Sequence, residues 1–362
     1  MKKNYFSIAM MAVVVAAGMS SCNNEDTENG ALQSRTLDAV SVGINTLQDS
    51  RAGITAEKFS GTESLGLYVF GGTGIDDVAN GNYNIGNSGA LRSTANVKYQ
   101  RNANTDQWTA PVDKAIILSS KDGILYGYYP WADVNADGKA VAIKVNNAQG
   151  SGQSNGAADV AEQTDFMWAT PITGMNNSTA HVDIKMNHAL SMMTFKFVRD
   201  SYPGEGKISS IVLKNAEGKS TLLTGDATMH IGTGAINNTA SVAGNITITP
   251  SDAEPLVDVV AAEKLPRMLV YPTAANVVAG EWQFVITMDT KVYTINVPNK
   301  TAAGSEYKLE AGKNYIYTFK LKGHGFGADD EEGRDDIASV TITKWNDVDV
   351  EGGDLTSPDD NK

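Results

Sequence analysis

The side chains that most often carry catalysis are few and widely spaced in this chain. The four histidines are His181, His188, His230 and His324. None has a neighbour at the HxxxH or HExxH spacing that places two ligands on one zinc ion. His188, within the segment MNHAL, is predicted to be a packed and hydrogen-bonded residue. We expect no catalytic residue, no metal site and no cofactor, and we interpret the chain as a protein that is not an enzyme.

One acidic segment resembles half of a calcium-binding loop. Residues 133–138 read DVNADG, which matches the alternating oxygen ligands at the start of such a loop. The twelfth position should be a bidentate glutamate, but Lys144 stands there and its ammonium would repel the ion. A polar turn of Asn, Asp and Gly is therefore favoured over a calcium site. The acidic residues at 331–336 are interpreted as a solvated loop.

The only cysteine, Cys22, follows a secretory signal. Lys2 and Lys3 precede an uncharged stretch at 5–19, which is shorter than the about 20 apolar residues of a membrane-spanning helix. A lone cysteine cannot form an internal disulfide, and a spare thiol is one interpretation. The sequence GMSSC also resembles a lipobox, at which signal peptidase II cuts before Cys22 and its sulfur then carries diacylglycerol. The polar stretch NNEDTENG behind it is predicted to be a tether.

Composition limits the partners of the chain. The formal net charge is −13 and the pI is near 4.8, whereas nucleic-acid binding needs a basic footprint, so we expect no nucleic-acid partner. The same charge argues against a polybasic membrane contact and favours a soluble extracellular surface. The 362 residues suffice for two domains. With no second cysteine, stability must come from packed cores.

Alternating apolar residues predict strands along most of the chain. In residues 37–47, Val40, Val42 and Ile44 alternate with polar or small residues, which is the period of a strand with one buried face. Residues 146–158 are predicted to be a low-complexity loop. Further strands are expected at 60–70, 116–118, 124–129, in two alternating stretches within 181–198, and at 208–213, 246–248, 268–271, 282–288, 292–297, 315–321 and 339–345. Short strands with turns between them predict an all-β fold of two antiparallel β-sandwiches that meet near residue 179.

Several segments in this order resemble the fimbrillin family, the type V pilins of gut and oral anaerobic bacteria. They are Cys22, FSGTESLGLY at 59–68, WTAPV at 108–112, ILYGYYP at 124–130, DFMWA at 165–169, MNHAL at 186–190, LEAGKNYIY at 309–317 and ITKW at 342–345. The resemblance implies two tandem transthyretin-like antiparallel β-sandwich domains. It also implies a lipoprotein precursor in the outer membrane, palmitate on the lipidated cysteine, and assembly into a cell-surface fimbrium by donor strand exchange. It implies no enzymatic activity.

The resemblance also implies that an Arg-specific protease removes the N-terminal strand. Arg51 stands in a polar turn just past the strand that carries Val40, Val42 and Ile44, so a cut there would free strand and lipid together. The alternative site, Arg35, would keep the strand and open no groove. An edge left without its neighbour is a template for another chain.

The C-terminal tail supplies a candidate donor strand. Val348 and Val350 share one face, and Leu355 follows the flexible pair at 352–353. A frayed edge strand is the alternative. The predicted segments are a signal peptide at 1–21, a lipidated tether at 22–35, a removable strand at 36–51, an N-terminal β-sandwich at 52–178, a C-terminal β-sandwich at 179–346 and the tail at 347–362.

The predicted function is therefore a structural pilin subunit that supports adhesion, with a stalk position favoured over a tip or anchor. Its partners would be further copies of itself, tip and anchor pilins, the protease and, before cleavage, the membrane. The alternative is a surface glycan-binding lipoprotein that presents tryptophans as stacking platforms, drawn from Trp108, Trp131, Trp168, Trp282 and Trp345.

Overall fold

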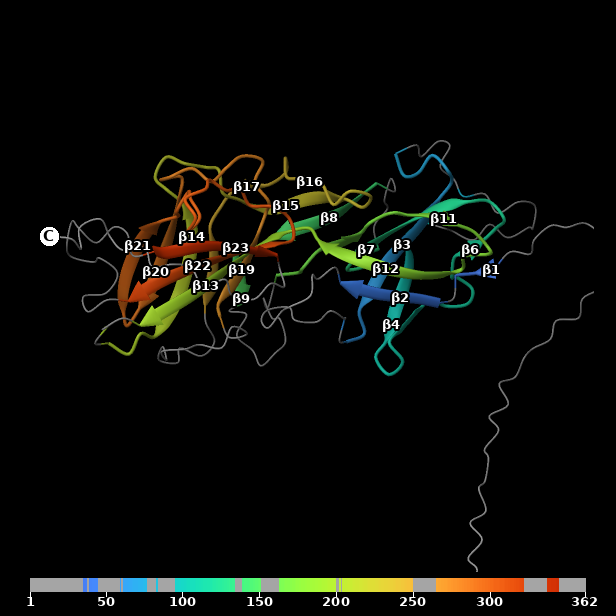
Figure 1. Ribbon diagram of the computed structural model, residues 1–362, viewed down its shortest axis with the longest axis horizontal. Helices are drawn as coiled ribbons and strands as arrows, with labels where there is room; N and C mark the ends of the chain where they lie inside the picture. The colour runs from blue at the N-terminus through green and yellow to red at the C-terminus, as the bar shows by residue number, and fades with distance from the viewer. Residues whose placement is uncertain are drawn as a thin grey trace, which may run out of the picture. The chain divides into compact units, whose positions relative to one another are not determined.

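The computed structural model describes a chain built from β-strands and loops (Figure 1). The described residues are 35–37, 39–44, 59, 61–76, 83, 95–133, 139–150, 163–199, 202, 204–249, 265–321 and 337–344. They all fall within one unit, Gln33–Lys362. They contain no helix, which confirms the predicted all-β class for this part of the chain. Accordingly, no described segment qualifies as a membrane-spanning helix.

The first sheet is built mainly from the N-terminal half of the chain. Its strands, in spatial order, are β10 (Met167–Ala169), β12 (His181–His188), β2 (Ala39–Ile44), β5 (Gln107–Thr109), β4 (Val97–Asn102), β3 (Ser64–Phe70), β7 (Gly123–Tyr129) and β11 (Ile172–Met175). Because β10 also pairs with β7, the strands from β10 to β7 close into a ring, and β11 lies outside it. The sheet is thus barrel-like, and its closure leaves few exposed strand edges.

One apolar core fills this ring. Trp108, Tyr99, Leu65 and Leu67 are at most 1% exposed, and they pack with inward residues of β12 and β2. The strict alternation of buried and exposed residues in β4 explains why its sequence VKYQRN forms a strand with one wet face. A short sheet of β1 (Arg35–Thr36) and β6 (Ile117–Leu118) adjoins this core.

The remaining strands form three further sheets. One contains β19 (Arg267–Val270), β13 (Ser191–Arg199), β22 (Lys313–Leu321) and β23 (Ile337–Lys344). Another contains β21 (Lys291–Asn296), β20 (Trp282–Met288), β14 (Ile208–Asn215), β18 (Ile246–Thr249) and β9 (Ala148–Gly150). The last contains β16 (Ile236–Asn237), β15 (Leu223–His230), β17 (Val242–Ala243) and β8 (Ala140–Val145).

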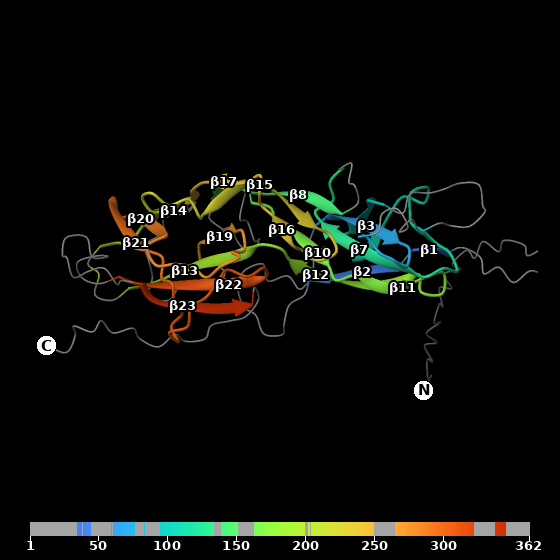
Figure 2. The same cartoon turned by 90° about the horizontal axis from the view of Figure 1, so that it is seen from above.

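Aromatic side chains join two of these sheets. Figure 2 shows β13, β22 and β23 as one layer and β14, β20 and β21 as another. Between them, Phe284 of β20 meets Phe195 of β13 edge to face with ring centroids 5.3 Å apart, and Tyr317 of β22 at 5.0 Å. Such pairs add stabilisation to the burial of large apolar surfaces.

Three strand pairings differ from the antiparallel arrangement predicted from the sequence. The pairs β2–β12, β13–β22 and β9–β18 are parallel, while the other pairings are antiparallel. The loop predicted at 146–158 also contains a strand, β9. Gln149 of that strand exchanges two hydrogen bonds with the backbone of Leu269, at 2.8 and 2.9 Å, and this pairing compensates for the weak strand propensity of the segment.

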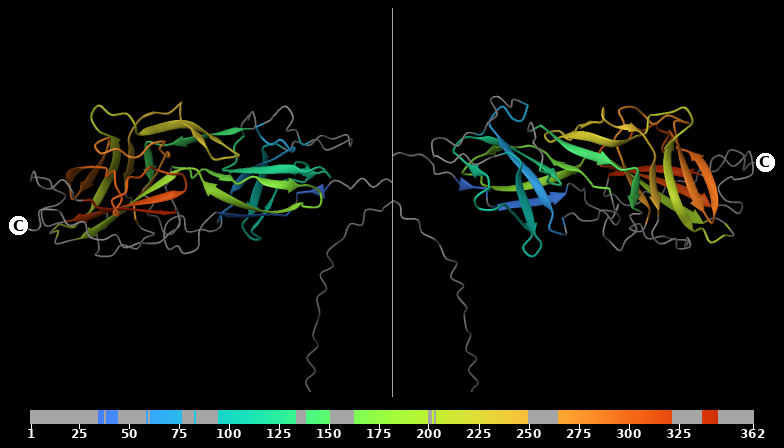
Figure 3. Two further views of the ribbon diagram at one scale, coloured as in Figure 1. Left: turned by 45° about the horizontal axis from the view of Figure 1, so that its top comes forward. Right: turned by 180° about the vertical axis from the view of Figure 1, so that it is seen from behind.

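The domain boundary near residue 179 stays a prediction. Strand β12, which begins at His181, shares the first sheet with β2 and β10. Strand β8, which precedes the boundary in sequence, pairs with β15, which follows it. Figure 3 shows these strands from two further directions.

Candidate functional site: the seat of the N-terminal strand and an adjoining groove

Strand β2 lies between β12 and β5 and is bound unequally to them. Six consecutive residues, from Ala39 opposite His181 to Ile44 opposite Met186, run parallel to β12. On its other side, β2 makes a single pairing, between Val40 and Trp108 of β5. The strand is therefore held mainly along one edge. We call the position between β12 and β5 that β2 occupies its seat.

The apolar face of β2 is in phase with that of β12. Val40 stands opposite Val182, and Val42 stands opposite Ile184. Val40 is 3% exposed, Val42 is half-buried against the same core, and Ser41 between them is exposed. A register slip of one residue would turn every one of these side chains to the wrong face, so the pattern fixes the register.

The chain just before β2 is tied to the core by Leu37. This residue is 1% exposed. Its backbone N–H donates to the carbonyl of Ile116 at 2.9 Å, and its carbonyl accepts a bond of 3.1 Å from the Tyr99 hydroxyl. The same hydroxyl accepts from the Ile116 N–H at 3.2 Å, so Tyr99 joins the two segments. The alternation in the sequence does not reveal this anchor, because Leu37 lies one residue out of phase with Val40.

Removal of the N-terminal segment would expose a long apolar trough. Its walls would be Trp108, Ile116, Val182 and Ile184, each at most 6% exposed in the intact chain. The facing backbone edges of β12 and β5 would lose their hydrogen-bond partners at the same time. Unpaired edges beside buried apolar surface favour the addition of another strand.

The predicted processing residues are distributed as follows. Arg35 is exposed and pairs in β1 with Leu118 of β6. Val40 and Val42 occupy the seat, and the backbone of Ile44 ends β2. Cys22, Arg51, Val348, Val350 and Leu355 lie outside the described residues, so their predicted roles stay predictions.

His188 is held in the core of the described residues. His188 is 4% exposed, and its Nδ1 lies 2.8 Å from Asp165 Oδ2, which confirms the predicted packed and hydrogen-bonded position. No group of three potential metal ligands occurs among the residues that the structure describes. Residues 152–156, GQSNG, have the spacing of a serine nucleophile elbow but lie outside the described residues.

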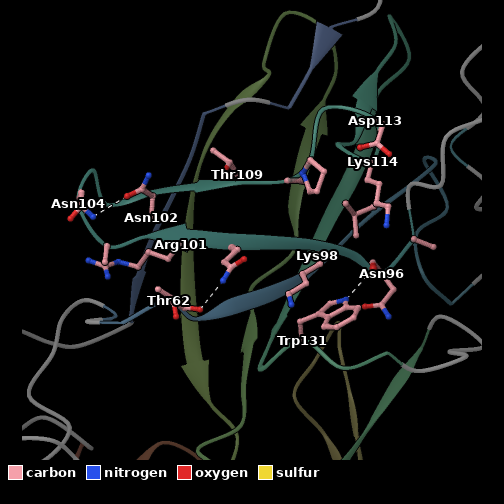
Figure 4. A pocket seen from close by; sticks show the side chains of 16 residues that line it. Thr62, Asn96, Lys98, Arg101, Asn102, Asn104, Thr109, Asp113, Lys114 and Trp131 are labelled. Carbon is pink, nitrogen blue, oxygen red and sulfur yellow. Dashed lines mark hydrogen bonds between the residues drawn. The ribbon is translucent and has the colours of Figure 1, made fainter.

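A second feature is an open groove on the outer face of β4 and β5. It has a volume of about 1100 Å³ (Figure 4). Lys98, Gln100 and Asn102, which point outward from β4, line it together with Trp131 and Lys114. The Lys98 ammonium lies over the Trp131 ring, 4.7 Å from its centroid, a geometry that favours the cation. The groove and the seat of β2 use opposite faces of the same hairpin.

The other predicted tryptophan platforms are not available as an array. Trp108 and Trp282 are buried, and Trp168 is partly buried against the core. Trp345 lies outside the described residues. Trp131, which is only partly buried, lines the groove on β4 and β5.

Comparison with known proteins assigns a family to this fold. The fimbrillin-like family matches residues 50–345, so the chain belongs to that family. No curated protein matches the chain.

Two solved structures support the same fold. A candidate cell adhesion protein from Bacteroides uniformis has a TM-score of 0.56 and 18% identity, over 85% of this chain and 98% of that one. Another from Bacteroides ovatus has a TM-score of 0.55 and 15% identity, over 88% of this chain and 100% of that one. At these identities the likeness concerns the fold.

Proposed function

We propose that the chain is a structural subunit of a cell-surface fimbria that polymerises by exchange of its N-terminal strand. The observation that carries the proposal is the seat of β2. This strand fills an apolar trough in phase with β12 but makes a single pairing with β5. A strand from another subunit with the same alternation could replace it without rearranging the rest of the sheet.

The position of the proposed cut agrees with this role. Strand β2 ends at Ile44, and Arg51 follows it by seven residues. Cleavage there would release β2 together with Cys22, which we propose carries the lipid of an outer-membrane precursor. Cleavage at Arg35 would leave β2 in place. The fimbrillin-like match begins at residue 50, after β2, so the family region does not include the strand.

The proposed donor is the C-terminal tail, in which Val348, Val350 and Leu355 would face the trough. A subunit that has both a trough and a donor can join neighbours at both ends, which favours a stalk position. The tandem transthyretin-like organisation, with domains at 52–178 and 179–346, belongs to the same proposal.

Charge supports apolar insertion as the driving force. Residues 1–51 contain four basic and five acidic residues, a net charge of −1. Their removal changes the formal charge from −13 to −12, so neighbouring subunits still repel one another. Burial of apolar surface stabilises a complex by about 25 cal/mol for each Å², and this gain in free energy must exceed the repulsion.

The test uses a chain that begins at Asn23 and therefore retains the whole unit Gln33–Lys362. It is digested with an Arg-specific protease, and the new N-terminus and the oligomers on an unboiled gel are recorded. We expect a fragment that starts at Ala52 and a ladder of oligomers. Arg51→Gln should prevent both, whereas the matched control Arg35→Gln should prevent neither.

Deletion of residues 347–362 tests the donor separately. The cleaved chain without this tail should open its trough but stay monomeric. Cleavage at Arg51 that never yields oligomers from the intact chain would contradict the stalk proposal. A ladder that persists without the tail would contradict the assignment of the donor.

A further inference from the structure

The groove on the outer face of β4 and β5 combines positive charge with amide groups on an acidic chain. Asp113 is the one acidic residue among its described lining residues, and the basic ones are Lys98, Arg101 and Lys114. Arg101 is already neutralised, because its Nε donates to Asp106 at 2.7 Å and its Nη1 to the Gly61 carbonyl at 2.8 Å. The two exposed lysines therefore supply the ammonium groups available to a ligand.

These lysines converge on one end of the groove. Figure 4 shows Lys98 above Trp131, and Lys114 with its neighbour Asp113 at the same end, in the turn after β5. The two ammonium groups outnumber the one carboxylate there. An ammonium group presents three hydrogen-bond donors and no acceptor, so this end favours an anionic group. Farther along β4 lie the exposed amides of Gln100 and Asn102. Gln100 Nε2 donates to the Thr62 carbonyl at 3.4 Å, and Asn102 Oδ1 accepts from the Asn104 N–H at 2.9 Å, which leaves the Gln100 oxygen and the Asn102 amino group for a ligand.

Trp131 is hydrogen-bonded at that end to the backbone of Asn96. The indole N–H donates to the Asn96 carbonyl at 3.3 Å, and the Asn96 amide donates to the carbonyl of Ala132 at 2.9 Å. The Tyr128 hydroxyl donates to the Asn96 side-chain oxygen at 2.7 Å, and its pKa is raised chiefly by burial, so it stays protonated. Asn96 has a φ of 50°, a conformation that asparagine tolerates better than most residues.

We propose that this groove binds an acidic oligosaccharide. Its carboxylate or sulfate would accept hydrogen bonds from Lys98 and Lys114, and its hydroxyl groups would bind the amides of Gln100 and Asn102. Apolar C–H groups of a sugar ring would contact the exposed part of the Trp131 indole. A site that is fixed before the ligand arrives loses less entropy on binding. The groove volume of about 1100 Å³ is ample for several sugar units.

An acidic sugar suits the groove better than an acidic peptide does. A peptide would be expected to pair with a strand edge, but the edges of β4 are occupied by β3 and β5. What the groove leaves exposed is a row of side chains with alternating donors and acceptors. That arrangement matches the hydroxyl groups of a sugar chain.

Binding is measured by calorimetry on the uncleaved monomer that begins at Asn23, so the result does not depend on strand exchange. The probes are chondroitin sulfate hexasaccharide, its desulfated form, neutral maltohexaose and a poly-glutamate peptide. We expect saturable binding of at least one acidic sugar, weakened by salt because the lysines are exposed. The desulfated form distinguishes a site for carboxylate from one that requires sulfate, and either result supports the proposal.

Three variants test which residues carry the binding. Lys98→Gln and Lys114→Gln should each weaken it about tenfold, since each removes a charge-assisted hydrogen bond. The matched control Lys291→Gln changes another exposed strand lysine, on β21, and should leave binding unchanged. Asn96→Gly keeps the backbone conformation and the carbonyl that accepts from the Trp131 indole, but it removes the side-chain bonds to the Ala132 carbonyl and the Tyr128 hydroxyl. The variant should loosen the support of Trp131 and weaken binding with both lysines intact. Equal binding of maltohexaose or poly-glutamate, or no effect of either groove lysine, would overturn the proposal.

Discussion

Strands β2 and β22 both run parallel to one neighbour, but the fold holds them in different ways. Strand β22 has eight register pairs with β13 on one side and seven with β23 on the other. Strand β2 has six pairs with β12 and one with β5. Strand β22 is therefore an interior strand bound along both edges, whereas β2 is bound mainly along one edge.

The side chains of β22 are also more deeply buried than those of β2. Tyr315, Tyr317 and Phe319 of β22 are all 0% exposed, and each stacks on another aromatic ring. In β2, Val40 is buried and Val42 only partly so. Removal of β22 would disrupt the aromatic core, whereas removal of β2 would expose the apolar trough and leave the rest of the sheet in place. A strand that buries few side chains and is hydrogen-bonded mainly along one edge can be well packed and still be replaced by another strand.

The largest effect is expected from truncation in β22. Phe319→Ala should lower the free energy of unfolding by about 3–5 kcal/mol, because the lost ring leaves a cavity among Phe195, Phe197 and Phe284. Urea denaturation of the chain that begins at Asn23 measures this. A loss below about 1 kcal/mol would show that β22 is not the interior strand described here.

A smaller effect is expected at the anchor of the N-terminal segment. Leu37→Ala should cost about 2 kcal/mol in the uncleaved chain, the low end for such a truncation, because the segment can detach before the rest unfolds. Hydrogen exchange should show β2 amides opening well below the global free energy, and those of β22 near it. Equal protection of the two strands would contradict the comparison.

The smallest effect on stability is expected at Asp289, in the turn between β20 and β21. Its contribution should depend on pH, because acid protonates the carboxylate. Burial raises the pKa of Asp289, but bonds of 2.8 Å from the N–H groups of Gly206 and Lys207 and from the Tyr202 hydroxyl outweigh it and lower the pKa overall. A lowered pKa means that its stabilisation is complete above the ordinary value of 3.8 and is lost as pH falls through the folded-state pKa.

Asp289→Asn keeps the turn but removes this charge. The variant should be about 1 kcal/mol less stable at neutral pH, and the gap should close below pH 3.8. Urea midpoints across that range measure the difference. A gap that stays constant with pH would show that the carboxylate charge contributes nothing to the turn.

Local patterns in the sequence predicted where strands lie better than they predicted which strands pair with each other. The alternation of Val40 and Val42 predicted β2, and that of the residues in β20 and β22 predicted those strands. The parallel pairing of β2 with β12 could not be predicted, because it joins residues about 140 positions apart, such as Ser41 and Asp183. Partner choice depends on the packing of the whole core, which no short window contains.

Strand β15 shows why other elements were missed. Its sequence, LTGDATMH, includes Gly225 and Asp226, both poor strand formers. Six residues of it nevertheless pair with β8, where Val141, Ile143 and Val145 are buried. In the groove, the exposed positions of β4 follow from its alternation. The clamp of Asn96 on Trp131 does not, since it joins residues 35 apart.

The most direct test of the central claim locks β2 in its seat. Ser41 and Asp183 are exposed, directly opposite in the β2–β12 register and joined by a hydrogen bond, and adjacent strands lie about 4.8 Å apart, a spacing that a disulfide can span. The double variant Ser41→Cys, Asp183→Cys, in the chain that begins at Asn23 and so lacks Cys22, is oxidised and digested with an Arg-specific protease. We predict cleavage at Arg51 without oligomers, and a ladder once the disulfide is reduced. A ladder from the oxidised protein would show that polymerisation does not use the seat of β2, and would contradict the account.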